Sequence, residues 1–263
     1  MSNKSKGKQM HMINNTILIT GGASGIGYEL AHQLCENNTV IITGRNQEKL
    51  DKAKSNLKNV HTFQCDVSNP QEIINLYEAV SQQFPELNIL INNAGIMKKI
   101  DLQQEIDLLT LTQEIDTNVN GVIRMCTQFI PLLKQQKMAA ILNVSSALAF
   151  VPFVSTPVYC ATKAAIHSYT QSLRIQLHNT KVKVFELAPP AIETPLINEF
   201  DASEQEGMAI MNVTKLANLA IEGIKSDKKE IRPGQSNLLK MMSRIAPSFA
   251  LNMLNKAYIS AHS

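Results

Sequence analysis

The chain has 263 residues, of which 44% are hydrophobic and 18% are charged, and its formal net charge is +3. These values are typical of a globular protein with a substantial core, and the length fits one large α/β domain. They exclude a disordered or collagen-like chain, and we expect no nucleic-acid partner because no dense Lys/Arg block follows the first residues.

Residues 1–12 are polar and basic, with no hydrophobic stretch behind them. We interpret them as a flexible lead rather than a secretory signal, followed by a single Rossmann-type domain over residues 13–263. No segment has the roughly 20 consecutive apolar residues that a transmembrane helix needs. The four cysteines and six histidines are scattered without metal-ligand spacing, so we expect no metal, no disulfide framework and a cytoplasmic location.

Short apolar runs alternate with longer helical patterns along the first two thirds of the chain. Runs such as Ile17–Ile19 and Ile89–Ile91 are apolar at successive positions, as in parallel strands that helices cover on both faces. The pattern predicts a Rossmann-like, doubly wound parallel sheet in a three-layer α/β/α arrangement. The predicted strands are Thr16–Thr20, Val40–Thr43, Val60–Gln64, Asn88–Ile91, Ala140–Ser145 and Val182–Leu187.

The first predicted strand is followed by a glycine-rich stretch that opens a helix expected to run through Leu34. Glycines let the backbone approach a pyrophosphate, and the N-terminus of the helix offers free N–H groups to it. The spacing of Thr20–Gly27 departs from the common G-x-G-x-x-G pattern, so a plain glycine-rich turn is the alternative. The predicted phosphate-binding residues are Gly21, Ser24, Gly25, Ile26 and Gly27.

The second predicted strand ends in Thr43-Gly44-Arg45-Asn46, where no acidic residue stands. An acidic residue here would accept the adenine-ribose hydroxyl of NAD, whereas an arginine accommodates the additional phosphate of NADP. Arg45 therefore favours NADP(H) over NAD(H). The alternative is a solvent-exposed arginine that begins the next helix.

Tyr159 and Lys163 are four residues apart in a helical pattern over Tyr159–Leu177, so both side chains can share one face. A free phenol has a pKa near ~10, and a neighbouring ammonium lowers it toward neutral pH. The pair is compatible with acid/base chemistry, but the same spacing also occurs by chance on many helix surfaces.

Five motifs follow one another in the order typical of the short-chain dehydrogenase/reductase family, and the chain resembles its single-domain branch over Thr16–Leu196. The motifs are T-G-x-x-x-G-x-G at Thr20–Gly27, Asn92–Gly95, Asn118 with Gly121, Ser145-Ser146, and Tyr159-x-x-x-Lys163.

The resemblance implies that Ser146 holds and polarises a substrate carbonyl and that Tyr159 donates or removes the proton. It further implies that Lys163 binds the nicotinamide ribose and lowers the tyrosine pKa, and that Asn118 holds a water in the proton relay. Ser145 and Ser146 cannot be told apart by chemistry alone. Only the family's spacing to Tyr159 favours Ser146.

The resemblance implies further cofactor contacts after the third, fourth and sixth strands, with Asn92 supporting the sheet nearby. Asp66 would border the adenine, although it could equally cap a helix over Asn69–Gln83. Pro190 stands where the family often has glycine, which changes the loop that follows the sixth strand because proline fixes φ and lacks a donor. These expected contacts are Asp66, Val67, Asn93, Ala94, Gly95, Pro189, Ile192 and Thr194.

The β/α rhythm weakens after Pro195. We predict one or two helices over residues 197–225, a short last strand over Glu230–Gly234 and a Met-rich helical tail, and expect residues 193–263 to form the substrate side. The tail carries an apolar stripe that fits a pocket lid, a subunit contact or, alternatively, docking to a membrane surface. Its residues are Leu238, Leu239, Met242, Ile245, Phe249, Leu251 and Leu254, with Pro247 between them.

The expected function is hydride transfer between a nicotinamide cofactor and a small carbonyl compound or its alcohol. Apolar residues over 147–154 and in the tail favour a hydrophobic substrate. The alternatives are a catalytically silent NADP(H)-binding sensor or scaffold, and a nucleotide-sugar epimerase or dehydratase, which usually has a longer chain and another glycine spacing. The family resemblance also implies a homodimer or homotetramer.

Overall fold

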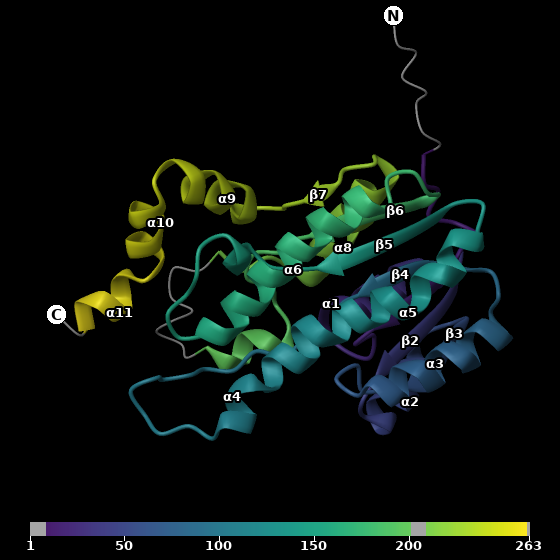
Figure 1. Cartoon of the computed structure of the whole chain (residues 1–263), viewed down its shortest axis with the longest axis horizontal. Helices are drawn as coiled ribbons and strands as arrows, with labels where there is room; N and C mark the ends of the chain where they lie inside the picture. The colour runs from purple at the N-terminus through teal and green to yellow at the C-terminus, as the bar shows by residue number, and fades with distance from the viewer. Residues whose placement is uncertain (1–8, 201–208, 262–263) are drawn as a thin grey trace, which may run out of the picture.

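The computed structural model describes residues 9–200 and 209–261 and contains a seven-stranded parallel sheet with the strand order β3-β2-β1-β4-β5-β6-β7 (Figure 1). The predicted doubly wound fold is confirmed, and the first six strands agree with their predicted bounds to within one residue at each end. The strands are β1 (Thr16–Thr20), β2 (Thr39–Gly44), β3 (Val60–Gln64), β4 (Leu87–Asn92), β5 (Ala139–Val144), β6 (Val182–Leu187) and β7 (Glu230–Ile231).

Helices cover both faces of the sheet because successive strand residues point to opposite sides. Ile17 and Ile19 of β1 pack into one apolar cluster with α1, α2 and α8, whereas Leu18 between them packs into a second cluster with α3, α5 and α6. The helices of the first face are α1 (Gly25–Leu34), α2 (Gln47–Asn56) and α8 (Val213–Lys225); those of the second are α3 (Pro70–Gln83), α5 (Gly121–Gln135) and α6 (Pro157–Gln176).

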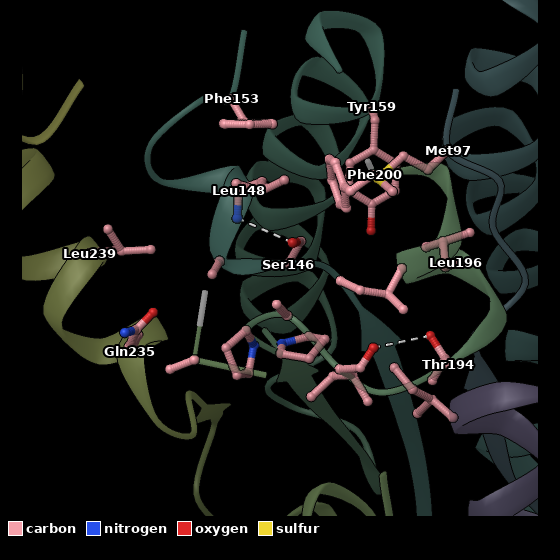
Figure 2. A pocket seen from close by; sticks show the side chains of 18 of the residues that line it. Met97, Ser146, Leu148, Phe153, Tyr159, Thr194, Leu196, Phe200, Gln235 and Leu239 are labelled. Atoms are coloured by element: carbon pink, nitrogen blue, oxygen red, sulfur yellow. Dashed lines mark hydrogen bonds between the residues drawn. The ribbon is translucent and has the colours of Figure 1, made fainter. Parts of the chain in front are cut away.

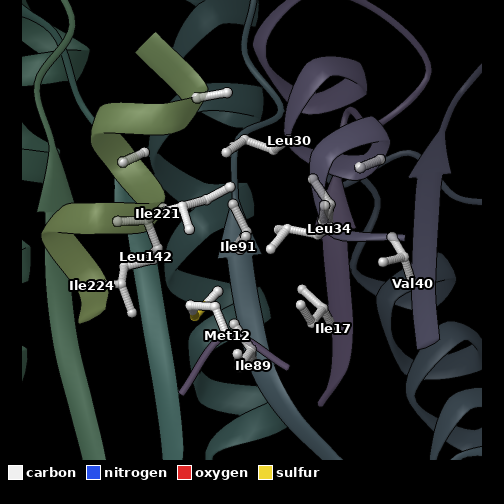
Figure 3. Close-up of a cluster of buried hydrophobic side chains, with 14 of the residues drawn as sticks. Met12, Ile17, Leu30, Leu34, Val40, Ile89, Ile91, Leu142, Ile221 and Ile224 are labelled. Atoms are coloured by element: carbon white, nitrogen blue, oxygen red, sulfur yellow. The ribbon is translucent and has the colours of Figure 1, made fainter. Parts of the chain in front are cut away.

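The core of the first face begins before residue 13. Met10 and Met12 are 2% and 5% exposed and belong to the same cluster as Leu30 of α1 and Ile91 of β4. Figure 3 shows Met12 beside Ile89, below the side chains that α1 and α8 direct onto the sheet. Two thioether side chains from the segment that the sequence analysis interpreted as a flexible lead thus supply core contacts.

The elements after β6 differ most from the prediction. β7 spans only Glu230–Ile231, because Pro233 soon follows and cannot donate a backbone hydrogen bond. Of the helical stretch predicted over residues 197–225, a short 3-10 helix (Pro195–Glu199) and α8 are present, and residues 201–208 lie outside the described part. The tail forms α9 (Gln235–Ile245), α10 (Pro247–Leu254) and α11 (Lys256–Ala261), with Pro247 in the first turn of α10, where proline is tolerated.

The apolar stripe of the tail divides between pocket and surface. Leu239 is buried against Ala147 and Val151, next to the carboxyl end of β5, and Leu254 packs against the same cluster. The other side of the stripe is exposed at Leu238, Ile245, Phe249 and Leu251. Within residues 9–200 and 209–261, no helix combines the length and the apolar character needed to cross a membrane.

Replacing Met12 with alanine should lower the free energy of unfolding by about 2–4 kcal/mol, because it removes a buried side chain and leaves a cavity. Ile13, next in the chain, is 54% exposed, and Ile13→Ala should change the free energy of unfolding by less than ~0.5 kcal/mol. Urea unfolding of both variants measures the difference. Equal effects would show that the segment before residue 13 is no part of the core.

Candidate active site

The turn between β1 and α1 places the N-terminus of α1 at the carboxyl edge of the sheet, at the point where the strand order reverses between β1 and β4. Gly21 and Gly25 have φ values of +64° and +55°, a region that favours glycine. A Cβ atom on Gly21 would lie 2.9 Å from the Cα atom of Ala94. Ser24 caps α1 without a side-chain hydrogen bond, so the arrangement fits a pyrophosphate on the free N–H groups.

The segment after β4 is tied to this turn by two side chains. Oγ1 of Thr20 accepts hydrogen bonds from the backbone N–H groups of Asn93 and Ala94, both at 3.0 Å. Nδ2 of Asn93 donates to the carbonyl oxygens of Thr20 and Gly21, at 3.0 and 3.1 Å. The two loops that would hold the middle of a dinucleotide are thereby fixed to one another.

Three adjoining hollows follow the carboxyl edge of the sheet, and we name them the adenine-side hollow, the middle hollow and the apolar pocket. The predicted site residues line one or more of these hollows, except Gly27 and Asn118, which lie behind them. The adenine-side hollow is lined by Arg45, Asp66 and Val67, and it shares Gly21, Ser24, Ala94 and Gly95 with the middle hollow. The middle hollow is also lined by Gly25, Ile26, Asn93, Tyr159, Lys163 and Thr194. The apolar pocket is lined by Ser146, Tyr159, Pro189 and Ile192.

At the adenine-side hollow, Nη1 of Arg45 lies 3.9 Å from Oδ2 of Asp66, and the Arg45 side chain is half-exposed. Lys49, which the sequence analysis did not select, lines the same hollow from the first turn of α2. The Asp66 side chain forms hydrogen bonds within its own loop, since its Oδ1 accepts from the backbone N–H and the hydroxyl of Ser68. Asn69, not Asp66, caps α3, so the helix-cap alternative for Asp66 is wrong.

Tyr159 and Lys163 are both buried on one face of α6, 7% and 4% exposed, as the spacing predicts. Nζ of Lys163 donates to the carbonyl oxygen of Val144 at 3.0 Å and lies 5.4 Å from the centre of the Tyr159 ring. Burial raises the pKa of Tyr159, and hydrogen bonding to Ser146 opposes that rise. Besides the expected effect of Lys163, the hydrogen bond to Ser146 is therefore an influence that lowers the pKa of Tyr159.

The two serines after β5 have different surroundings. The hydroxyl of Ser145 donates to Oε1 of the buried Glu186 at 2.5 Å. Ser146 lines the apolar pocket, and Figure 2 shows its hydroxyl and that of Tyr159 directed into the same space. Of the two, Ser146 is thus the serine whose hydroxyl is near Tyr159, which chemistry alone did not distinguish.

Asn118 lies in a π-helical turn (Asp116–Asn120) between α4 (Leu108–Ile115) and α5. Its Oδ1 accepts from the N–H of Ile96 at 2.9 Å, and its Nδ2 donates to the carbonyl oxygen of Ile96 and to Oγ1 of Thr162. A Cβ atom on Gly95 would lie 3.3 Å from Oδ1 of Asn118 and 3.5 Å from Nζ of Lys163. Asn118 and Lys163 therefore both lie next to Gly95, and Lys163 also lines the middle hollow.

Glu114, one turn before Asn118, is a buried carboxyl group that the sequence analysis missed. Its Oε1 accepts from the N–H of Lys98 at 3.1 Å, and its Oε2 has no partner among the described residues. Burial raises the pKa of Glu114 to about 7, against the opposing influence of Lys98 and Lys163. Burial lowers the pKa of Lys163 to about 8.

The apolar pocket adjoins the hydroxyls of Ser146 and Tyr159. Among the described residues that line it, polar side chains come only from Ser146, Tyr159, Thr194 and Gln235. The loop after β6 is held in place because the carbonyl oxygen of Pro189 accepts from the N–H of Ala147 at 2.8 Å. Leu239 and Leu254 of the predicted apolar stripe line this pocket, whereas the sequence analysis did not select individually the other apolar side chains Met97, Leu148, Phe153, Leu196 and Phe200.

The short chain dehydrogenase family model matches residues 15–205. The chain belongs to the short-chain dehydrogenase family. It is 43% identical over 226 residues to the "Uncharacterized oxidoreductase DltE" of Bacillus subtilis (strain 168), an alignment that covers 84% of this chain and 89% of that protein. The predicted family is thus confirmed, and the chain is an oxidoreductase of this type.

Solved structures of short-chain dehydrogenases have the same fold. One from Burkholderia phymatum, in complex with NAD, gives a TM-score of 0.80 at 21% identity and covers 91% of this chain and 95% of its own. Another from Burkholderia cenocepacia J2315, in complex with NADP, gives a TM-score of 0.81 at 22% identity and covers 93% of this chain and 99% of its own. Dinucleotides of both kinds occupy proteins of this architecture.

The burial of Glu114 predicts a pH-dependent stability. A carboxyl group whose pKa rises from 4.5 to about 7 on folding contributes stability that is fully present below pH 4.5 and is lost as the pH rises through 7. The wild-type protein should therefore lose roughly 2–4 kcal/mol relative to Glu114→Gln between about pH 4.5 and 8.

Chemical unfolding of both proteins across this pH range measures the difference. Glu78→Gln on the exposed side of α3 is the control, and its difference from the wild type should not change with pH. A constant difference for Glu114→Gln would contradict the raised pKa.

Proposed function

We propose that the chain transfers a hydride between NADP(H) and an apolar carbonyl compound or its alcohol, with Tyr159 as the general acid and base. One observation carries this proposal: Tyr159 lines both the middle hollow and the apolar pocket, and the Ser146 hydroxyl is directed into the same space. A group that exchanges a proton with the substrate must lie at this boundary between cofactor and substrate.

The residues around the middle hollow fit a dinucleotide. The N-terminus of α1 with Gly21 and Ser24 would hold the pyrophosphate, and Lys163 would hold the nicotinamide ribose. When bound, the nicotinamide supplies the hydride for reduction or accepts it in oxidation.

The chain's own residues would handle the charge and the proton. In the reducing direction the substrate oxygen gains negative charge, which the Ser146 hydroxyl stabilises by donating a hydrogen bond. Tyr159 then gives its phenolic proton to that oxygen. The ammonium of Lys163, buried 5.4 Å from the ring centre, favours the phenolate that remains.

A preference for NADP(H) follows from the charges at the adenine-side hollow. Arg45 and Lys49 are two cations beside a place where a 2′-phosphate would lie, and Asp66 is the carboxylate next to Arg45. Since one solved relative holds NAD and another NADP, the fold accepts either, and the preference rests on these side chains.

The lining of the apolar pocket supports a hydrophobic carbonyl compound as substrate. Aromatic and aliphatic side chains from four separate segments surround the Ser146 hydroxyl, including Met97, Phe153, Phe200 and Leu239. The proposed substrate therefore has an uncharged body, because a buried charge without a partner is costly.

Tyr159→Phe should reduce kcat for carbonyl reduction by about 10²–10⁴-fold and leave the NADPH affinity within about twofold, since the variant loses only the proton donor. Turnover of a carbonyl panel is followed by nicotinamide absorbance, and binding by fluorescence titration. Tyr77→Phe on α3, whose ring packs on Phe129, is the matched control and should keep full activity. Tight NADPH binding without turnover of any substrate by the wild type would favour a sensor instead.

Arg45→Ala should raise the Kd for NADPH about tenfold and leave that for NADH nearly unchanged, because a half-exposed charge-assisted contact to phosphate is lost. Lys49→Ala should act in the same direction. Lys52→Ala, one turn further along α2 and exposed, is the control. Equal weakening of both cofactors by Arg45→Ala would end the proposed preference.

A further inference from the structure

The buried carboxyl group of Glu114 has no place in the proposed mechanism, although it lies beside the residues that perform it. Glu114 is 0% exposed at the end of α4, and α4 packs against α6, which carries Tyr159 and Lys163. Only one of its two oxygens has a hydrogen-bond partner among the described residues, the N–H of Lys98. The hydrogen bond to Lys98 therefore leaves a buried polar oxygen unsatisfied, which is costly, and does not by itself account for a carboxyl group at this position.

The charged side chains that influence the pKa of Glu114 come from two segments. Lys98 lies in the loop after β4, and its Nζ donates to Oε1 of Gln113 at 2.7 Å. From α6, Lys163 interacts with Glu114 by charge, and Glu114 in turn acts on Tyr159 and Cys160. Lys163 is 4% exposed, so its ammonium is the desolvated cation of this group.

We propose that Glu114 is a positioning residue whose negative charge holds Lys163 as an ammonium and Tyr159 as a phenol, and so extends carbonyl reduction to higher pH. The inference rests on the proposed function of Tyr159. A carboxylate near both groups favours the protonated form of each, because it attracts the ammonium and repels a phenolate. Reduction needs the phenol, and oxidation of the alcohol needs the phenolate.

The sign of the pH effect follows from the ionisation of Glu114 itself. Its pKa is raised to about 7, so the side chain is neutral in acid and anionic in mild base. Wild type and Glu114→Gln should therefore have the same pH profile below about pH 6 and diverge above about pH 7. In Glu114→Gln, the loss of reduction at high pH and the gain of oxidation should both move about one pH unit lower.

Two substitutions at this position separate charge from hydrogen bonding. Glu114→Gln keeps an oxygen for the N–H of Lys98 and removes the charge, whereas Glu114→Asp keeps the charge and withdraws the oxygen. If charge matters, Glu114→Asp keeps the wild-type pH limits and Glu114→Gln shifts them. The reverse result would assign Glu114 to holding the loop and would overturn the inference.

A second measurement needs neither substrate nor cofactor. The pKa of Lys163, lowered to about 8 in the wild type, is accessible to NMR titration of ¹³Cε-lysine, with the signal assigned through Lys163→Met. It should fall by about one unit in Glu114→Gln and stay unchanged in Glu78→Gln. An unchanged Lys163 pKa in Glu114→Gln would overturn the inference. A shifted pKa in a protein that reduces no carbonyl would support the coupling and refute the proposed function.

Discussion

The site depends on the hydrogen bonds that join the loop after β1 to the loop after β4. Thr20 and Asn93 each satisfy two backbone groups of the other loop, at 3.0–3.1 Å. These bonds hold Gly21, with its positive φ, against Ala94, and that contact leaves no room for a side chain. The orientation of α1 and the start of the segment that carries Gly95 are thereby fixed together, before any ligand is bound.

Near the carboxyl edge of the sheet, the chain buries the ionisable side chains of Lys163 and Glu114, which would otherwise be solvated. Removing Lys163 and Glu114 from water disfavours the charge on each, and their mutual attraction offsets part of that cost. A pKa near 8 for the ammonium and near 7 for the carboxyl brings both groups into the range where enzymes exchange protons. Burial therefore shifts the pKa values of the ionisable groups at this site, in addition to the pairing of Tyr159 with Lys163 that the sequence pattern indicates.

What the sequence predicted follows from local rules. Consecutive apolar residues in β1 and β4 identify doubly covered strands, and the glycines between β1 and α1 identify a tight turn, because each signal lies within a few neighbouring residues. The burial of Met10 and Met12, the short β7 and the position of Glu114 depend on segments distant in the chain. Glu114 is part of a helix pattern that is equally consistent with a solvated face, and only the packing of α4 on α6 makes it buried.

In the proposed function, the boundary between the middle hollow and the apolar pocket is where few polar side chains would suffice for the reaction. Tyr159 lines both spaces, and the surrounding side chains that reach the pocket are mostly apolar. In the proposed function, the Ser146 hydroxyl among these apolar side chains would stabilise a developing oxyanion more than it would in an open cleft. Burial also raises the pKa of Tyr159, which favours the protonated phenol that the proposed reduction needs. The apolar surroundings would therefore favour the proposed reduction in two ways, since they keep Tyr159 as a phenol that can donate its proton and they suit a hydrophobic substrate.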